Sequence, residues 1–115
     1  MKKATTIEEL IAWAQDLDKR ASDVYLTFTF TLKENSAGVI IWAQSPEGGL
    51  GDHILNENKM FCLEKEKTPL EVVNDLLLLA ELTIAQNRQK YLRKRIDELE
   101  KEIQRCNQEL QNDEN

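Results

Sequence analysis

The only histidine, His53, is the residue of this 115-residue sequence best suited to transferring a proton at neutral pH. Asp52 stands beside it and could orient the imidazole, and Glu57 lies near in sequence. A general base also needs a cleft and a group that positions the substrate. Neighbours within one glycine-rich loop provide neither. We therefore expect a solvated loop histidine, no catalytic residue and no enzymatic activity.

The sequence offers equally little for a cofactor. Gly48-Gly49-Leu50-Gly51 lacks the spacing and the strand-to-helix context of a phosphate-binding loop, so a flexible turn is the better interpretation. Cys62 and Cys106 stand far apart, and no pair of Cys or His has metal-ligand spacing. We expect no metal, no cofactor, and two cysteines that serve as small buried apolar residues in a reducing cytosol.

One basic segment could bind nucleic acid, with cations neutralising phosphates and a tyrosine stacking on a base. It consists of Arg88, Lys90, Tyr91, Arg93, Lys94 and Arg95. An acidic block follows in residues 97–102, and the chain carries a net charge of −6. This acidity argues against general binding to DNA or anionic membranes. A solvated helix face is therefore the preferred interpretation, and nucleic-acid binding is the alternative.

These residues lie on one long helix, predicted from Thr68 to about Asn112. Thr68, Pro69 and Glu71 have the order of a capping box with proline in the first helical position, and no glycine or proline follows. The first half is apolar on several sides, which indicates a core helix. Polar residues at 71, 74, 75 and 81 interrupt it, so it is too polar for a membrane span.

The second half of this helix changes period. Apolar or uncharged residues alternate steps of three and four, which is the a/d pattern of a coiled coil held for four heptads. This heptad stripe consists of Leu82, Ala85, Gln89, Leu92, Ile96, Leu99, Ile103, Cys106 and Leu110. A lone helix cannot bury such a stripe, so we expect a homodimer; folding back onto the chain's own domain is the weaker alternative. Residues 1–81 then form the compact domain, and residues 82–115 form the coiled coil with a frayed tail.

Charge along the heptad stripe is arranged in blocks, with basic residues before Ile96 and acidic residues after it. An antiparallel pair that crosses near Ile96 sets basic against acidic, whereas a parallel pair sets like against like over much of its length. One parallel contact, Arg95 with Glu100, is favourable. The pattern predicts a preference for the antiparallel pair.

The rest of the chain predicts a helix and three strands. Thr6 and Glu9 begin a helix that ends near residues 19–21, with Ile7, Leu10, Ile11, Ala14 and Leu17 at helical spacing. Residues 24–33 alternate apolar and polar side chains over ten positions, as in a half-buried strand. Residues 39–44 return as a strand that is apolar on both faces, which indicates a central strand or a partner on its outer face.

Residues 45–58 are predicted to form a long loop, which suggests function or mobility, and residues 59–64 a short third strand. The fold class is therefore α+β in the order α-β-β-β-α. It has a three-stranded antiparallel meander with both helices on its apolar face, and a C-terminal helix that extends into a coiled coil.

The functional expectation is a non-enzymatic protein–protein interaction module. It self-associates through its C-terminal helix and acts on another protein as an inhibitor, adaptor or chaperone. It could also block a groove that binds nucleic acid. In outline, this acidic α-β-β-β-α chain with a dimerising helix resembles bacterial or phage accessory proteins such as secretion chaperones and inhibitors of host defence nucleases. Because Met1-Lys2-Lys3 leads into a polar amphipathic helix, we expect a cytoplasmic protein.

Overall fold

The computed structural model describes residues 3–45, 49–61 and 67–113. Its elements are α1 (Ile7–Ser22), β1 (Leu26–Leu32), β2 (Ser36–Gln44), β3 (Leu50–Met60) and α2 (Pro69–Asp113). This order confirms the predicted α-β-β-β-α fold. The chain divides into two compact units, Met1–Ala85 and Gln86–Asn115, and α2 contributes to both.

Helix α1 begins where local capping predicts. The Thr6 hydroxyl accepts a hydrogen bond from the Glu9 amide at 3.2 Å, while the Glu9 carboxylate accepts one from the Thr5 amide at 2.7 Å. The helix buries Leu10, Leu17 and Ala21, so it packs along a narrower stripe than its apolar residues suggest.

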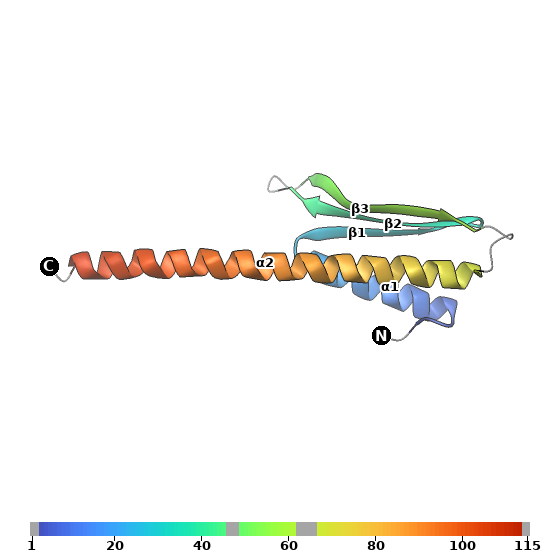
Figure 1. Ribbon diagram of the computed structural model, residues 1–115, viewed down its shortest axis with the longest axis horizontal. Helices are drawn as coiled ribbons and strands as arrows, with labels where there is room; N and C mark the ends of the chain where they lie inside the picture. The colour runs from blue at the N-terminus through green and yellow to red at the C-terminus, as the bar shows by residue number, and fades with distance from the viewer. Residues whose placement is uncertain (1–2, 46–48, 62–66, 114–115) are drawn as a thin grey trace. The chain divides into compact units, whose positions relative to one another are not determined.

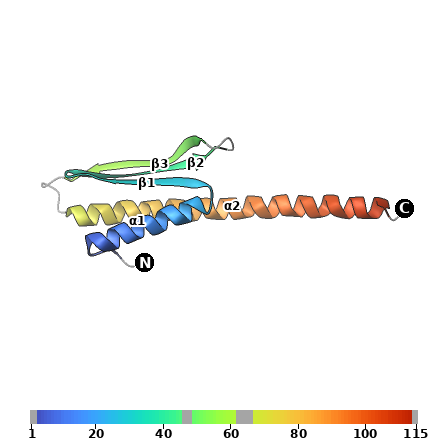
Figure 2. The same cartoon turned by 180° about the vertical axis from the view of Figure 1, so that it is seen from behind.

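The three strands form an antiparallel sheet in which β2 is central, as its apolar character predicts. One face of β2 is buried through Ala37, Val39 and Ile41, and it continues into Leu26 and Phe28 of β1. Both helices lie on this side of the sheet (Figures 1 and 2), and side chains from α1, the sheet and α2 form one core cluster. The fold therefore has two layers, a sheet and a pair of helices.

Strand β3 corrects the prediction of a loop over residues 45–58. Residues 50–60 form a strand beside β2, so residues 59 and 60 of the predicted third strand are the end of this longer strand. Residues 46–48 of the predicted loop and residues 62–64 of the predicted strand lie outside the described part. An edge strand gains backbone hydrogen bonds from one neighbour and needs few apolar side chains. The pairing of β2 with β3 also has two register shifts near Trp42, and these interrupt the alternation of inward and outward side chains along β3. A Cβ on Gly51 would approach the Ala43 carbonyl oxygen to 2.8 Å, so glycine permits the close pairing there.

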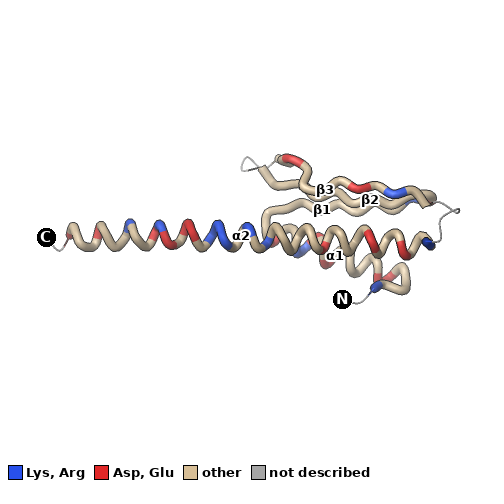
Figure 3. Tube along the Cα trace, viewed as in Figure 1, with Lys and Arg blue, Asp and Glu red and all other residues tan. Residues whose placement is uncertain are grey.

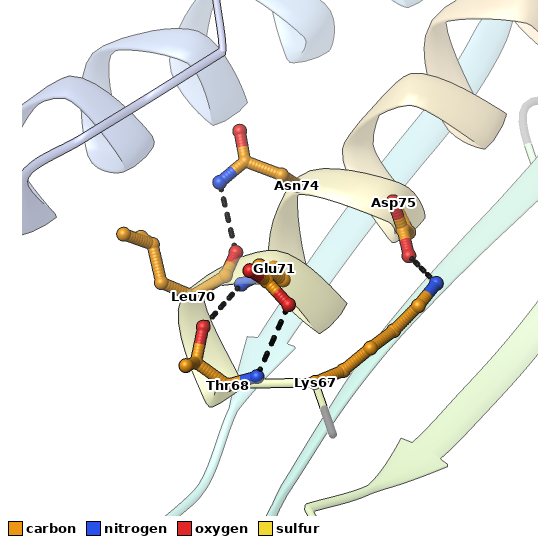
Figure 4. A network of polar contacts seen from close by, with 6 residues as sticks. All are labelled: Lys67, Thr68, Leu70, Glu71, Asn74 and Asp75. Atoms are coloured by element: carbon orange, nitrogen blue, oxygen red, sulfur yellow. Dashed lines mark hydrogen bonds and ion pairs between the residues drawn. The ribbon is translucent and has the colours of Figure 1, made fainter. Parts of the chain in front are cut away.

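Helix α2 starts with the predicted capping box (Figure 4). The Glu71 amide donates to the Thr68 hydroxyl at 3.2 Å, and the Thr68 amide donates to the Glu71 carboxylate at 3.3 Å. Lys67 forms an ion pair with Asp75 at 2.6 Å, and this contact holds the pKa of the Asp75 carboxyl below its ordinary value. The start of α2 is thus fixed by residues within two turns of it.

Asn74 ties the N-terminal segment to α2. Its side-chain oxygen accepts a hydrogen bond from the Ala4 amide at 2.8 Å, and its side-chain nitrogen donates to the carbonyls of Ala4 at 3.1 Å and Leu70 at 2.8 Å. Asn74 is 3% exposed and Ala4 6%. This polar residue is therefore a structural part of the core. In the described residues, no helix combines the length and apolarity needed to cross a membrane.

Candidate interaction surface

The heptad stripe lies on α2 and is exposed along its length. Its large apolar members are between 40% (Leu99) and 59% (Ile103 and Leu110) exposed. The small and polar members, Ala85, Gln89 and Cys106, are exposed as well. In the unit Gln86–Asn115 all described residues belong to the helix, so nothing within that unit covers the stripe. A row of exposed Leu and Ile at heptad spacing is the surface that a second helix covers in a coiled coil.

The thiol of Cys106 corrects one expectation. We predicted a buried apolar cysteine. In the single chain Cys106 is free and exposed, because it belongs to the heptad stripe, which is itself exposed. Cys62 lies outside the described residues.

Charged residues flank the stripe on both sides, at the positions conventionally called e and g. Taking Leu92 and Leu99 as d positions puts Arg93 and Glu100 at e, and Arg88, Arg95, Glu102 and Glu109 at g. Figure 3 shows basic residues preceding acidic ones along this part of α2. Among the described residues, these blocks are joined by the long ion pair from Arg95 to Glu98 at 3.7 Å. The charged side chains at the e and g positions are exposed in the single chain.

The six candidate nucleic-acid residues do not share one face of the helix. Arg88 and Arg95 stand at g, and Arg93 stands at e, beside the heptad stripe. Lys90, Tyr91 and Lys94 occupy the outer positions. All five cations are exposed, and Tyr91 is half-buried. A nucleic-acid strand along one face would thus meet only part of this set, together with the carboxylates at 97 and 98.

The sheet has a second exposed surface, opposite the helices. This outer face carries Thr27, Thr29 and Thr31 from β1, Ile40 and Trp42 from β2, and His53, Asn56 and Asn58 from β3. Trp42 and Ile40 are half-buried by neighbouring side chains, and a shallow cavity of about 170 Å³ lies beside Gly38 and Ile40. Phe61, which directly follows β3, packs against the core cluster.

His53 belongs to β3 and not to a loop, which corrects its predicted setting. Its ring lies 5.5 Å from that of Trp42 between centroids, with the planes tilted by 59°. Such a contact is an ordinary aromatic packing arrangement on a sheet surface. Among the described residues, no group of three or more His, Cys, Asp or Glu side chains could hold a metal ion.

A buried ion pair was not recognised in the sequence. Arg20 of α1 bonds to Glu81 of α2 at 2.5 Å and to Asp16 at 2.8 Å, and Glu81 is only 8% exposed. Among the described groups, Arg20 Nε and Glu81 Oε2 are buried without a hydrogen-bond partner. The pair lines a cavity of about 430 Å³ together with Trp13. The sequence contained one indication of this ion pair, which is the position of the acidic residue Glu81 within the apolar half of the long helix.

Comparison with known proteins adds no assignment. No protein-family model matches the sequence, and neither curated proteins nor solved structures show significant similarity to it.

Proposed function

We propose that this protein is a non-enzymatic interaction module that forms a homodimer through the heptad stripe and acts on another protein as an inhibitor, adaptor or chaperone. The observation that carries the proposal is the exposed stripe on α2, whose Leu92, Ile96, Leu99 and Ile103 are each at least 40% exposed. Burying a Leu or Ile side chain contributes about 1.5–3 kcal/mol. Pairing of two such stripes therefore supplies a large driving force for association.

The outer face of the sheet supports a role toward a different protein. Trp42 and Ile40 form an apolar centre between polar rows of threonines and asparagines. An aromatic residue within a polar rim is typical of protein interfaces. Dimerisation would present two copies of this face, which increases the apparent affinity for a multivalent partner.

The proposal places the protein in the cytoplasm, where an exposed thiol such as Cys106 stays reduced. Its net charge of −6 also fits an inhibitor that occupies a basic, nucleic-acid-binding groove of its target. A partner without a basic surface would contradict this blocking mode and leave the interaction module intact.

The mass of the protein in solution tests the dimer. We expect light scattering after size exclusion to give twice the chain mass for the natural protein and one chain mass for Ile96→Glu and Leu99→Glu. Gln104→Glu is the matched control, because it adds the same carboxylate on the outer side of the same exposed helix segment. Retained far-UV ellipticity in all variants shows that folding is intact. A natural protein that is monomeric throughout contradicts the proposal.

Capture of partners from a nuclease-treated bacterial lysate tests the second part. We expect one stoichiometric protein, which Trp42→Ala no longer retains if the outer face is the binding surface. Recovery of nucleic acid alone, once nuclease is omitted, would instead favour the basic segment 88–95.

Nucleic-acid binding through that segment is the second candidate, supported by its five exposed cations. It predicts affinity that falls steeply with salt and with Lys90→Ala or Lys94→Ala. Affinity that does not change between low and physiological salt would remove this candidate.

A further inference from the structure

We infer that the two copies pair antiparallel, in the single register that places Ile96 of one copy against Leu99 of the other. This inference rests on the proposed self-association and specifies its partner surface, a second copy of the same stripe running in the opposite direction. The argument comes from the order of side chains along and beside the stripe.

This register first places apolar residues of the two stripes opposite one another. In an antiparallel coiled coil an a residue faces a d residue of the other chain, and all layers follow once one is fixed. Ile96 on Leu99 places Leu92 opposite Ile103, so that four consecutive layers contain only Leu and Ile. Outside them, Gln89 meets Cys106, and Ala85 meets Leu110, where a small side chain faces a large one. Leu82 falls opposite Asp113, at the last residue of the helix.

The flanking charges then select this register. Antiparallel pairing brings e residues against e and g residues against g. Here Arg93 faces Glu100, Arg95 faces Glu102, and Arg88 faces Glu109, and the two-fold axis repeats each contact. The remaining e contact joins two amides, Gln86 and Asn107. Every flanking pair is therefore an opposite-charge pair or an amide pair, and none is a like-charge pair.

Shifts by one heptad lose this complementarity. A shift in one direction places Arg93 opposite Arg93 of the second chain, and Arg95 opposite Arg95. A shift in the other direction places Glu100 opposite Glu100, and Glu102 opposite Glu102. Like charges at these positions oppose pairing, so the neighbouring antiparallel registers are disfavoured.

The parallel pair is the main competitor, because Ile at a and Leu at d also suit a parallel dimer. Because the apolar residues suit both orientations, the charged residues at e and g determine which orientation is more stable. Parallel pairing joins a g residue to the e residue five positions later on the other chain. This gives Arg88 with Arg93, which repel, Arg95 with Glu100, which attract, and Glu102 with Asn107. One repulsion cancels one attraction, whereas the antiparallel register has three attractions on each side of the two-fold axis.

Crosslinking from a single introduced cysteine distinguishes these arrangements. In a Cys62→Ser background, Cys106 of one copy lies level with position 89 of the other in the antiparallel register. It then lies roughly 25 Å along the axis from its own counterpart. We expect no crosslink from Cys106 alone, and efficient crosslinking by a short bismaleimide after Gln89→Cys. Lys94→Cys, on the outer side of the helix, is the matched control and should not crosslink to Cys106.

The linked residues identify the orientation. A Glu-specific protease should release peptides 82–98 and 103–109, and we expect mass spectrometry to find these two joined. Links from 106 to 106 or from 89 to 89 would establish a parallel pair and overturn the inference. A dimer that forms no link would overturn the register. A monomer by light scattering would instead remove the proposed self-association itself, so the two failures are distinguishable.

Charge reversal gives an independent test whose sign depends on orientation. Arg93→Glu places a carboxylate against Glu100 in the antiparallel pair, and we expect the dimer dissociation constant to rise about tenfold, because two symmetry-related contacts change from attraction to repulsion. Adding Glu100→Arg should restore it. In a parallel pair Arg93→Glu removes the repulsion from Arg88 and tightens the dimer. Tighter dimerisation of the single variant, measured by sedimentation equilibrium, would therefore overturn the inference.

Discussion

Replacing Asn74 by alanine should destabilise the compact unit strongly for a single polar residue. Two hydrogen bonds to the backbone of Ala4 and one to Leu70 are lost. Ala4 is 6% exposed, so its amide and carbonyl would lose their partners in a buried position. Each net hydrogen bond contributes about 1 kcal/mol, and stranding a buried group costs more. Alanine regains about 0.5 kcal/mol of helix propensity. We therefore expect a loss of about 2 kcal/mol in the free energy of unfolding.

Urea unfolding followed by tryptophan fluorescence is the appropriate assay, because Trp13 and Trp42 both belong to the unit Met1–Ala85. Asn112→Ala, an exposed substitution in the same helix, is the matched control and should change stability by less than about 0.5 kcal/mol. A similarly small change for Asn74→Ala would refute the reasoning, since it would mean that Ala4 is not held by this side chain in solution.

Three further substitutions test other parts of the fold. Arg20→Met should cost about 2 kcal/mol of unfolding free energy by leaving the Glu81 carboxylate buried and unpaired, and Arg20→Met with Glu81→Met should recover most of it; a double variant as unstable as the single one would contradict this. Lys67 lowers the pKa of Asp75 and thereby contributes to the free energy of unfolding, and Asp75→Asn should remove this contribution. Because that contribution is present above the ordinary value of 3.8 and lost as the pH falls through the lower folded pKa, the urea midpoints of variant and natural protein should differ at neutral pH and converge in acid. Gly51→Ala should cost about 1–2 kcal/mol because its Cβ meets a backbone oxygen, whereas Gly49→Ala, with nothing within 4 Å, should be neutral; equal thermal midpoints for the two would contradict this.

Local signals predicted much of this fold. The capping box at Thr68 and Glu71 involves residues three apart, and the alternation along β1 repeats every second residue, so neither needs information from elsewhere in the chain. The central position of β2 was also predictable, because edge strands tend to carry charged or polar side chains, whereas β2 is apolar along most of its length. These features together were enough for the element order and for the face that the helices cover.

Features that depend on distant partners were not predictable. Asn74 looked like a break in an apolar run, and its partner Ala4 is 70 residues away. Glu81 looked the same, and its partner Arg20 is 61 residues away. Strand β3 was mistaken for a loop because its side chains are mostly exposed and its pairing with β2 is irregular. In each case the sequence shows a polar residue or a glycine, while the stabilising group belongs to another element.

Helix α2 has a buried apolar side and an exposed apolar side, so the core and the proposed dimer can be tested independently. Near the end of the compact unit the helix buries Ala80 and Ile84, while Leu82 and Ala85 are exposed. At 3.6 residues per turn, Ala85 lies about 100° around the helix from Ile84, and the heptad stripe continues on that side. In the proposed dimer, covering Leu82 and Ala85 would therefore involve side chains that do not belong to the core. Substitutions in the stripe should therefore weaken the proposed self-association of the natural protein. They should leave the urea unfolding of the compact unit nearly unaltered when that unfolding is compared between variants that are all monomeric.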